Sequence, residues 1–240
     1  MLKTIIYLMF LFVFVSCTKS DDNAEKTPTL MVKFSAKEFN NTTNKLETLF
    51  GGADSYTPIT RAPNGSNRIS PLKTVEMEAK EALLPFSAKG EQIRNAILEA
   101  SSEGTLLLSN IERSNLINLD DASLAGIAYI ISTLSIIRQL EPEINSSKLS
   151  KNDFIECLSV AIGFNAISGL YGYISGTAAM MSARTALQLA GAFVGRTLGW
   201  VGVAWALYDF GKCVHDRHKC VFSIPYEKIK PVYCITLSDS

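Results

Sequence analysis

Hydrophobic and polar positions divide the chain into a polar N-terminal part and a helical C-terminal part. From residue 17 to about 71, Asn, Thr, Ser, Gly and Pro recur in runs such as NNTTN and APNGSNRISP, a composition that buries little surface. The pattern predicts a flexible tether over 17–71, interrupted by a short strand at 30–34 and a marginal helix at 45–50. The remainder of the chain predicts a mainly α fold.

Apolar residues recur at three- and four-residue spacing from residue 72 onward, and this spacing predicts an amphipathic helical region over 72–150. One helix is expected over 72–84 and another over 87–99. Pro85 is expected to separate them, because proline lacks the backbone N–H that an interior helical position needs.

Polar residues mark where the next helices of this region begin. Ser109 and Glu112 form the capping-box pattern of a short helix that runs through about residue 116. Asp120 or Asp121 is placed to cap a longer helix over 122–140. That helix is apolar on nearly every side, which is typical of a helix at the centre of a core or in lipid.

Charge nearly disappears between residues 154 and 208, where only Glu156, Arg184 and Arg196 are charged. Glycine and alanine are frequent in the same stretch, and Pro is absent from it. We expect a Gly/Ala-rich hydrophobic hairpin over 151–214, with helices over 153–174, 178–193 and 195–213, the last two either separate or continuous.

The spacing of glycines predicts close helix packing in this hairpin. Gly191, Gly195 and Gly199 recur every four residues on one helix face, and Gly172 and Gly176 repeat the spacing earlier. Because glycine costs about 1 kcal/mol against alanine in a helix, aligned glycines indicate that another helix approaches closely. The same spacing serves association in lipid and tight packing in water.

Arg196 favours packing in water. It lies near the middle of 187–208, which is long enough to span a bilayer. A central arginine costs about 2.5–3.5 kcal/mol on membrane insertion. We therefore expect a buried hairpin rather than a permanent membrane span.

Residues 1–16 have the three parts of a secretion signal, since Lys3 precedes an apolar run over 4–15 and a small residue, Ser16. Cys17 follows at once, and the stretch FVSC resembles the lipobox of bacterial lipoproteins. The resemblance implies that the signal peptide is cleaved before Cys17 and that this cysteine is acylated. Lipid anchoring would then attach the chain to a membrane, which is the partner that we expect.

Two details refine this resemblance. Phe14 stands where the lipoprotein family usually has Leu or Val. The polar stretch at 19–22, KSDD, resembles the acidic signal that follows the cysteine in surface-exported lipoproteins of some Gram-negative bacteria. It implies an outer-membrane lipoprotein of the cell envelope, exposed at the cell surface.

Five cysteines are present, and lipidation of Cys17 leaves an even number for disulfides outside the cytoplasm. Three pairings are open. We favour Cys157 with Cys213, because the antiparallel hairpin brings its two ends together and closing about 55 residues stabilises by about 4 kcal/mol. Cys220 then pairs with Cys234.

The last two cysteines lie in a short tail over 215–240, where 220–224 and 232–237 are predicted strands. A zinc site is the alternative for this region, because Cys213, His215, His218 and Cys220 are zinc-ligand types. Their spacing is tighter than that of usual zinc frameworks, so we predict structural disulfides and neither metal nor cofactor.

Charge and motifs exclude several classes of function. Loss of Lys3 with the signal peptide leaves 23 − 1 = 22 basic residues against 23 acidic ones, a formal charge of −1 and no basic field for nucleic acid. The sequence lacks a GxSxG elbow, a P-loop and an HExxH motif. We therefore predict a non-catalytic protein and assign no catalytic residue.

The hydrophobic hairpin carries the remaining functional hypothesis. Its segments VAIGFNAISGLYGYISG and ALQLAGAFVGRTLGWVGVAWALYDFGKCV resemble the apolar, Gly-rich helices of bacteriocin-like membrane-active peptides. That resemblance implies a surface lipoprotein whose hairpin engages membranes. In the alternative, the chain is a structural or binding lipoprotein, and the hairpin is simply its core.

Overall fold

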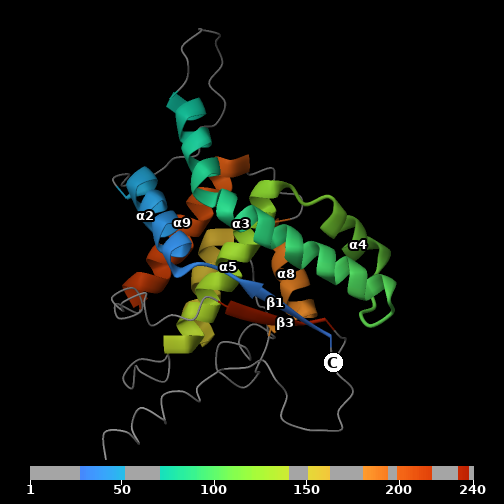
Figure 1. Ribbon diagram of the computed structural model, residues 1–240. Helices are drawn as coiled ribbons and strands as arrows, with labels where there is room; N and C mark the ends of the chain where they lie inside the picture. The colour runs from blue at the N-terminus through green and yellow to red at the C-terminus, as the bar shows by residue number, and fades with distance from the viewer. Residues whose placement is uncertain are drawn as a thin grey trace, which may run out of the picture.

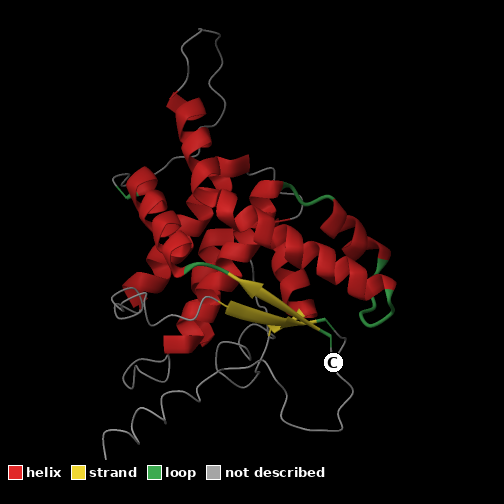
Figure 2. Cartoon of the chain, viewed as in Figure 1, coloured by secondary structure: helices red, strands yellow, loops and turns green. Residues whose placement is uncertain are grey.

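The computed structural model describes residues 28–51, 71–140, 151–162, 181–193, 199–217 and 232–237. Helices dominate this part of the chain, which confirms the predicted mainly α fold (Figures 1 and 2). The helices are α2 (Ala36–Phe50), α3 (Pro71–Ser102), α4 (Asn110–Ile117), α5 (Asp121–Leu140), α6 (Lys151–Ile162), α8 (Ala183–Phe193) and α9 (Gly199–Arg217). The strands are β1 (Thr29–Lys33), β2 (Met181–Ser182) and β3 (Val232–Thr236).

Helix α2 lies inside the segment predicted as a tether, so the tether prediction is wrong for residues 36–44. The marginal helix expected at 45–50 is the last part of α2. Ser35 and Glu38 form a capping box at the start of the helix, with the Glu38 N–H donating to Ser35 Oγ at 3.4 Å and the Ser35 N–H donating to Glu38 Oε2 at 3.2 Å. Phe39, Leu46 and Phe50 are buried at helical spacing. The remaining tether residues, 17–27 and 52–70, lie outside the described residues.

Helix α3 is continuous where two helices were predicted, because Pro85 stands inside it. A proline in a helix interior costs about 3 kcal/mol. Leu83 and Phe86, on either side of it, are fully buried in the common core, so tertiary packing outweighs the lost backbone hydrogen bond. The Lys89 ammonium also donates to the Pro85 carbonyl at 2.9 Å.

The predicted starts of α4 and α5 are confirmed. The Glu112 N–H donates to Ser109 Oγ at 3.2 Å, and the Ser109 N–H donates to Glu112 Oε2 at 2.8 Å, which completes the capping box. At the next helix the Ser123 N–H donates to Asp120 Oδ1 at 2.7 Å. Residues 122–136 are all buried, so α5 is the central helix of the core, one of the two environments that its apolar pattern allowed.

Aromatic side chains join α2, α3 and α5 into this core. The Tyr129 ring stacks on Phe39, with ring centroids 5.1 Å apart, and meets Phe86 edge-on at 5.2 Å. Its hydroxyl forms a hydrogen bond with Thr43 Oγ1 at 2.9 Å. Thr42, on the same helix, donates from Oγ1 to the Ala82 carbonyl of α3 at 2.8 Å. Helix α2 is therefore fastened to two core helices by packing and by hydrogen bonds.

A small three-stranded sheet lies along one side of the helices (Figure 2). Strand β3 is central, antiparallel to β1 with Thr29 opposite Thr236, and parallel to β2 with Met181 opposite Ile235. The predicted strands at 30–34 and 232–237 are thus confirmed and pair with each other. The other predicted tail strand, 220–224, lies outside the described residues.

The hydrophobic hairpin supplies α6, α8 and α9. Helix α8 ends its described part at Phe193 and α9 begins at Gly199, which has a positive φ of 56°; the residues between them, 194–198, lie outside the described residues. In the described part of the chain no single helix is long and apolar enough to cross a bilayer. The pair formed by α4 and residues 121–136 of α5, bent by 103°, passes that test on length and composition alone.

Candidate functional site

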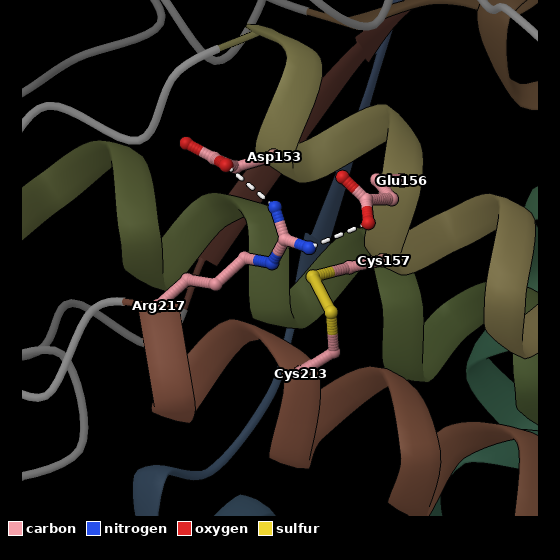
Figure 3. Close-up of a disulfide and its surroundings, with 5 residues drawn as sticks. All are labelled: Asp153, Glu156, Cys157, Cys213 and Arg217. Carbon is pink, nitrogen blue, oxygen red and sulfur yellow. Dashed lines mark hydrogen bonds and ion pairs between the residues drawn. A yellow bond between two sulfur atoms is a disulfide. The ribbon is translucent and has the colours of Figure 1, made fainter.

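A disulfide joins α6 to α9 and confirms the first predicted cysteine pair. Cys157 and Cys213 are bonded, with their Cα atoms 5.5 Å apart and a sequence separation of 56 (Figure 3). Cys157 is fully buried. On the chain-entropy argument a ring of this size stabilises the fold by about 4 kcal/mol.

Two ion pairs stand beside the disulfide. Arg217, one turn beyond Cys213 on α9, reaches back to α6, with Nη1 2.6 Å from Asp153 Oδ1 and Nη2 2.7 Å from Glu156 Oε1 (Figure 3). Its hydrogen bonds to Glu156 and then to Asp153 raise the pKa of the guanidinium. We call these five residues, Asp153, Glu156, Cys157, Cys213 and Arg217, the α6–α9 clamp.

The other predicted cysteine and metal sites are only partly placed. Cys17 and Cys220 lie outside the described residues, and Cys234 lies in β3 opposite Met31. The sulfur of Cys213 is bonded to Cys157, so Cys213 cannot be a thiolate ligand of the alternative zinc site. No group of three or more His, Cys, Asp or Glu side chains in the described ranges is arranged to hold a metal ion.

The predicted packing glycines are described only in part. Gly172, Gly176 and Gly195 lie outside the described residues, as does the rest of the segment 194–198. Among the described residues, a methyl group added at Gly191 or Gly199 would meet nothing within 4 Å, and Gly199 has a positive φ of 56° at the start of α9. Within this part of the chain, the expected close approach of another helix is therefore not found at these two glycines.

Close helix packing falls instead on Gly90 and Gly126. A methyl group at Gly90 in α3 would collide with the backbone carbonyl of Leu124 in α5. One at Gly126 in α5 would lie 2.9 Å from the Phe193 ring and 3.0 Å from Val203 Cγ1. Each is a single glycine inside a helical pattern, and that was the signal available in the sequence.

A cleft opens between α2 and α9. Its volume is about 490 Å³. The α2 wall consists of Asn40, Thr43, Asn44 and Glu47, whose spacing places them on one helix face, and the hydroxyl-bearing Tyr129 of α5 also lines the space. We call this space the α2–α9 cleft.

The α9 wall of the cleft mixes charges with an aromatic ring. It consists of Tyr208, Gly211, Lys212, His215 and Asp216, again on one helix face. Burial, and to a lesser extent the Glu47 carboxylate, raises the pKa of the Tyr208 hydroxyl. That phenol therefore stays protonated. The Lys212 ammonium lies 6.0 Å from the centre of the Tyr208 ring.

Behind this wall, burial also raises the pKa of Asp209, opposed by the charge of Lys212 and by a hydrogen bond from the Trp205 side chain. Trp205 and Tyr208 both contact the ring of Phe50 at the end of α2, with centroids 5.0 and 5.8 Å away. Aromatic packing therefore closes one end of the contact between α2 and α9. The described side chains offer hydrogen-bonding groups around a hollow, an arrangement suited to binding.

Comparison with protein families, with curated proteins and with solved structures finds no match to this chain. Neither the fold nor the cleft therefore inherits a role from a relative. The burial, the disulfide and the cleft described above are therefore the features that bear on function.

Proposed function

We propose that the chain is a membrane-anchored bacterial lipoprotein that displays a non-catalytic, helical binding domain outside the cytoplasm. The anchor is the acylated Cys17, after removal of residues 1–16. The acidic stretch at 19–22 directs it to the outer surface of the cell. The hydrophobic hairpin is the core of the displayed domain, and membrane engagement of the bacteriocin-like kind is the less favoured candidate.

Burial of the hydrophobic helices is the observation that carries this choice. In α5 every residue from 122 to 136 is buried, and most of α8 and the inner face of α9 are buried with it. These side chains share one core with α2 and α3. Turning such helices outward toward a bilayer forfeits about 1.5–3 kcal/mol for each large apolar side chain, until lipid replaces the lost contacts.

The disulfide supports a location outside the cytoplasm. Structural disulfides form and persist in oxidising environments such as the bacterial periplasm and cell surface, and they are rare in the cytoplasm. Cys157 and Cys213 are bonded within the folded domain. An exported, lipid-anchored domain accounts for both the leader and this bond.

The anchor is tested by mass analysis of the full-length chain produced in a bacterium that processes lipoproteins. We expect the mature N-terminus to be an acylated Cys17, and Cys17→Ala to keep the leader or leave the membrane fraction. Protease treatment of intact cells then reports surface exposure. An intact leader on the wild-type chain, or an unmodified thiol at its new terminus, contradicts the proposal.

The role of the hairpin is tested by dye release from vesicles of phosphatidylethanolamine and phosphatidylglycerol. We expect no release by the purified full-length chain, with its disulfide oxidised or reduced, because the apolar helices remain in the core. Release in either state would instead favour the membrane-active function.

A further inference from the structure

We propose that the α2–α9 cleft binds an uncharged, polyhydroxylated ligand of the size of one or two sugar rings. The inference names a ligand class for the binding domain of the proposed function and rests on that function only for the compartment. The cleft volume of about 490 Å³ lies within the range of small-molecule sites.

Gly211 is the first residue that favours a ligand in the cleft. It stands in the interior of α9, where glycine costs about 1 kcal/mol relative to alanine. Close approach of a described neighbour does not explain it, because a methyl group there would meet nothing within 4 Å among the described residues. The missing side chain leaves room in the cleft, and room for a ligand accounts for a glycine that packing does not need.

The facing wall supplies the hydrogen-bonding groups. Asn40 and Asn44 lie one turn apart on α2, and their side-chain amides have no hydrogen-bond partner among the described residues. An amide both donates and accepts, and a hydroxyl group does the same. Tyr208, across the cleft, adds a phenol. These groups match ligand hydroxyls better than they match a purely accepting or purely donating ion.

The charges of the cleft nearly cancel. Lys212 contributes one positive charge, and Glu47 and Asp216 contribute two negative ones, a sum of −1 from these three side chains. Phosphate, sulfate and carboxylate ligands are usually held by clustered cations or by a bidentate arginine. The cleft presents neither of these among its lining residues, so it favours ligands without charge.

The test is saturation-transfer NMR on the full-length chain in detergent, with glucose, galactose, mannose, N-acetylglucosamine, maltose and lactose as probes at millimolar concentration. Glucose 6-phosphate and glucosamine are the anionic and cationic comparators. We expect transfer to at least one neutral sugar, weaker transfer to its charged analogue, and loss of transfer in Gly211→Leu, whose side chain fills the cleft.

Two matched pairs of variants localise the binding. Gly191→Leu makes the same change at another exposed helical glycine and should leave binding unchanged. Asn40→Ala should weaken binding about tenfold through one lost hydrogen bond. Asn41→Ala should not weaken it, because Asn41 lines a different groove, between α2 and α3. Circular dichroism confirms the fold of each variant. If Gly211→Leu does not fold, the effect of Asn40→Ala on binding tests whether the sugar occupies the α2–α9 cleft.

Transfer to no neutral sugar overturns the ligand class, as does equal transfer in the wild type and Asn40→Ala, or a preference for the charged comparators. None of these outcomes affects the acylation of Cys17. Conversely, an unprocessed leader would overturn the anchor and leave sugar binding in place.

Discussion

Two pairs of helices in this protein are held together by different means. Helices α3 and α5 meet at Gly90, where the absence of a side chain lets two backbones touch, and the surrounding contacts are apolar. Helices α6 and α9 meet at the α6–α9 clamp, where a disulfide and two ion pairs connect them. The first contact depends on shape and apolar burial. The second also buries Leu158 and Ile162, but it adds a bond that depends on oxidation and two pairs that depend on charge.

This difference separates the domain into a permanent and a conditional part. The α3–α5 contact is present whatever the redox state or ionic strength of the surroundings. Helix α6 packs mainly against α9 and buries Leu158 and Ile162 in the common core, so its attachment relies only in part on the bond that an oxidising compartment provides. We expect α6 to loosen first when that bond is removed.

Gly90→Ala should have the largest effect. Its methyl group collides with the main chain of Leu124, which has no freedom to rotate away, so we expect a loss of more than about 4 kcal/mol in the free energy of unfolding by urea. Gly191→Ala is the control and should be neutral or stabilising by up to about 1 kcal/mol. A small cost for Gly90→Ala would mean that the crossing of the two helices is loose.

Removal of the disulfide should come next. We expect Cys157→Ala combined with Cys213→Ala to lower the free energy of unfolding by about 3–4 kcal/mol, because the unfolded chain regains the freedom that the bond removes. Hydrogen exchange should show faster exchange in α6 and unchanged protection at the centre of α5. Equal loss of protection in both would erase the distinction between the two parts.

Gly126→Ala should have an intermediate cost. Here the added methyl group meets the side chains of Phe193 and Val203, which can shift, so we expect a loss of about 1–3 kcal/mol. Its comparison with Gly90→Ala in the same urea titration tests whether backbone contact or side-chain contact sets the cost. A larger loss at Gly126 would reverse that order.

Arg217→Gln should have the smallest effect on global stability, since its two ion pairs are solvent-exposed. We expect faster hydrogen exchange in α6, chiefly at low salt, and a larger effect in the variant that lacks the disulfide. An effect that is the same in both backgrounds and at all salt concentrations would show that the ion pairs and the disulfide act independently.

The sequence predicted elements whose signals are local. The capping box of Ser109 and Glu112 and the all-round apolar pattern of α5 each depend on residues a few positions apart, and both predictions are confirmed. The pairing of Cys157 with Cys213 was also predicted, because a hairpin brings its ends together.

Other features depended on partners distant in sequence. The same capping pattern at Ser35 and Glu38 was available, but the polar composition of its surroundings hid a helix that the core completes. Pro85 is tolerated because of tertiary contacts that no local window contains. The volume of the cleft depends on how α2 and α9 sit side by side, and no spacing within either helix reveals that.

The position of strand β3 near the end of the chain affects the order in which parts of the fold can form. Among the described residues its antiparallel partner β1 lies at the other end of the chain, so this pairing waits until residues 232–236 have been made. Loops that long form slowly, because closing them costs entropy before any contact is made. In the export that we propose, β1 would therefore stay without this partner until translocation is almost complete.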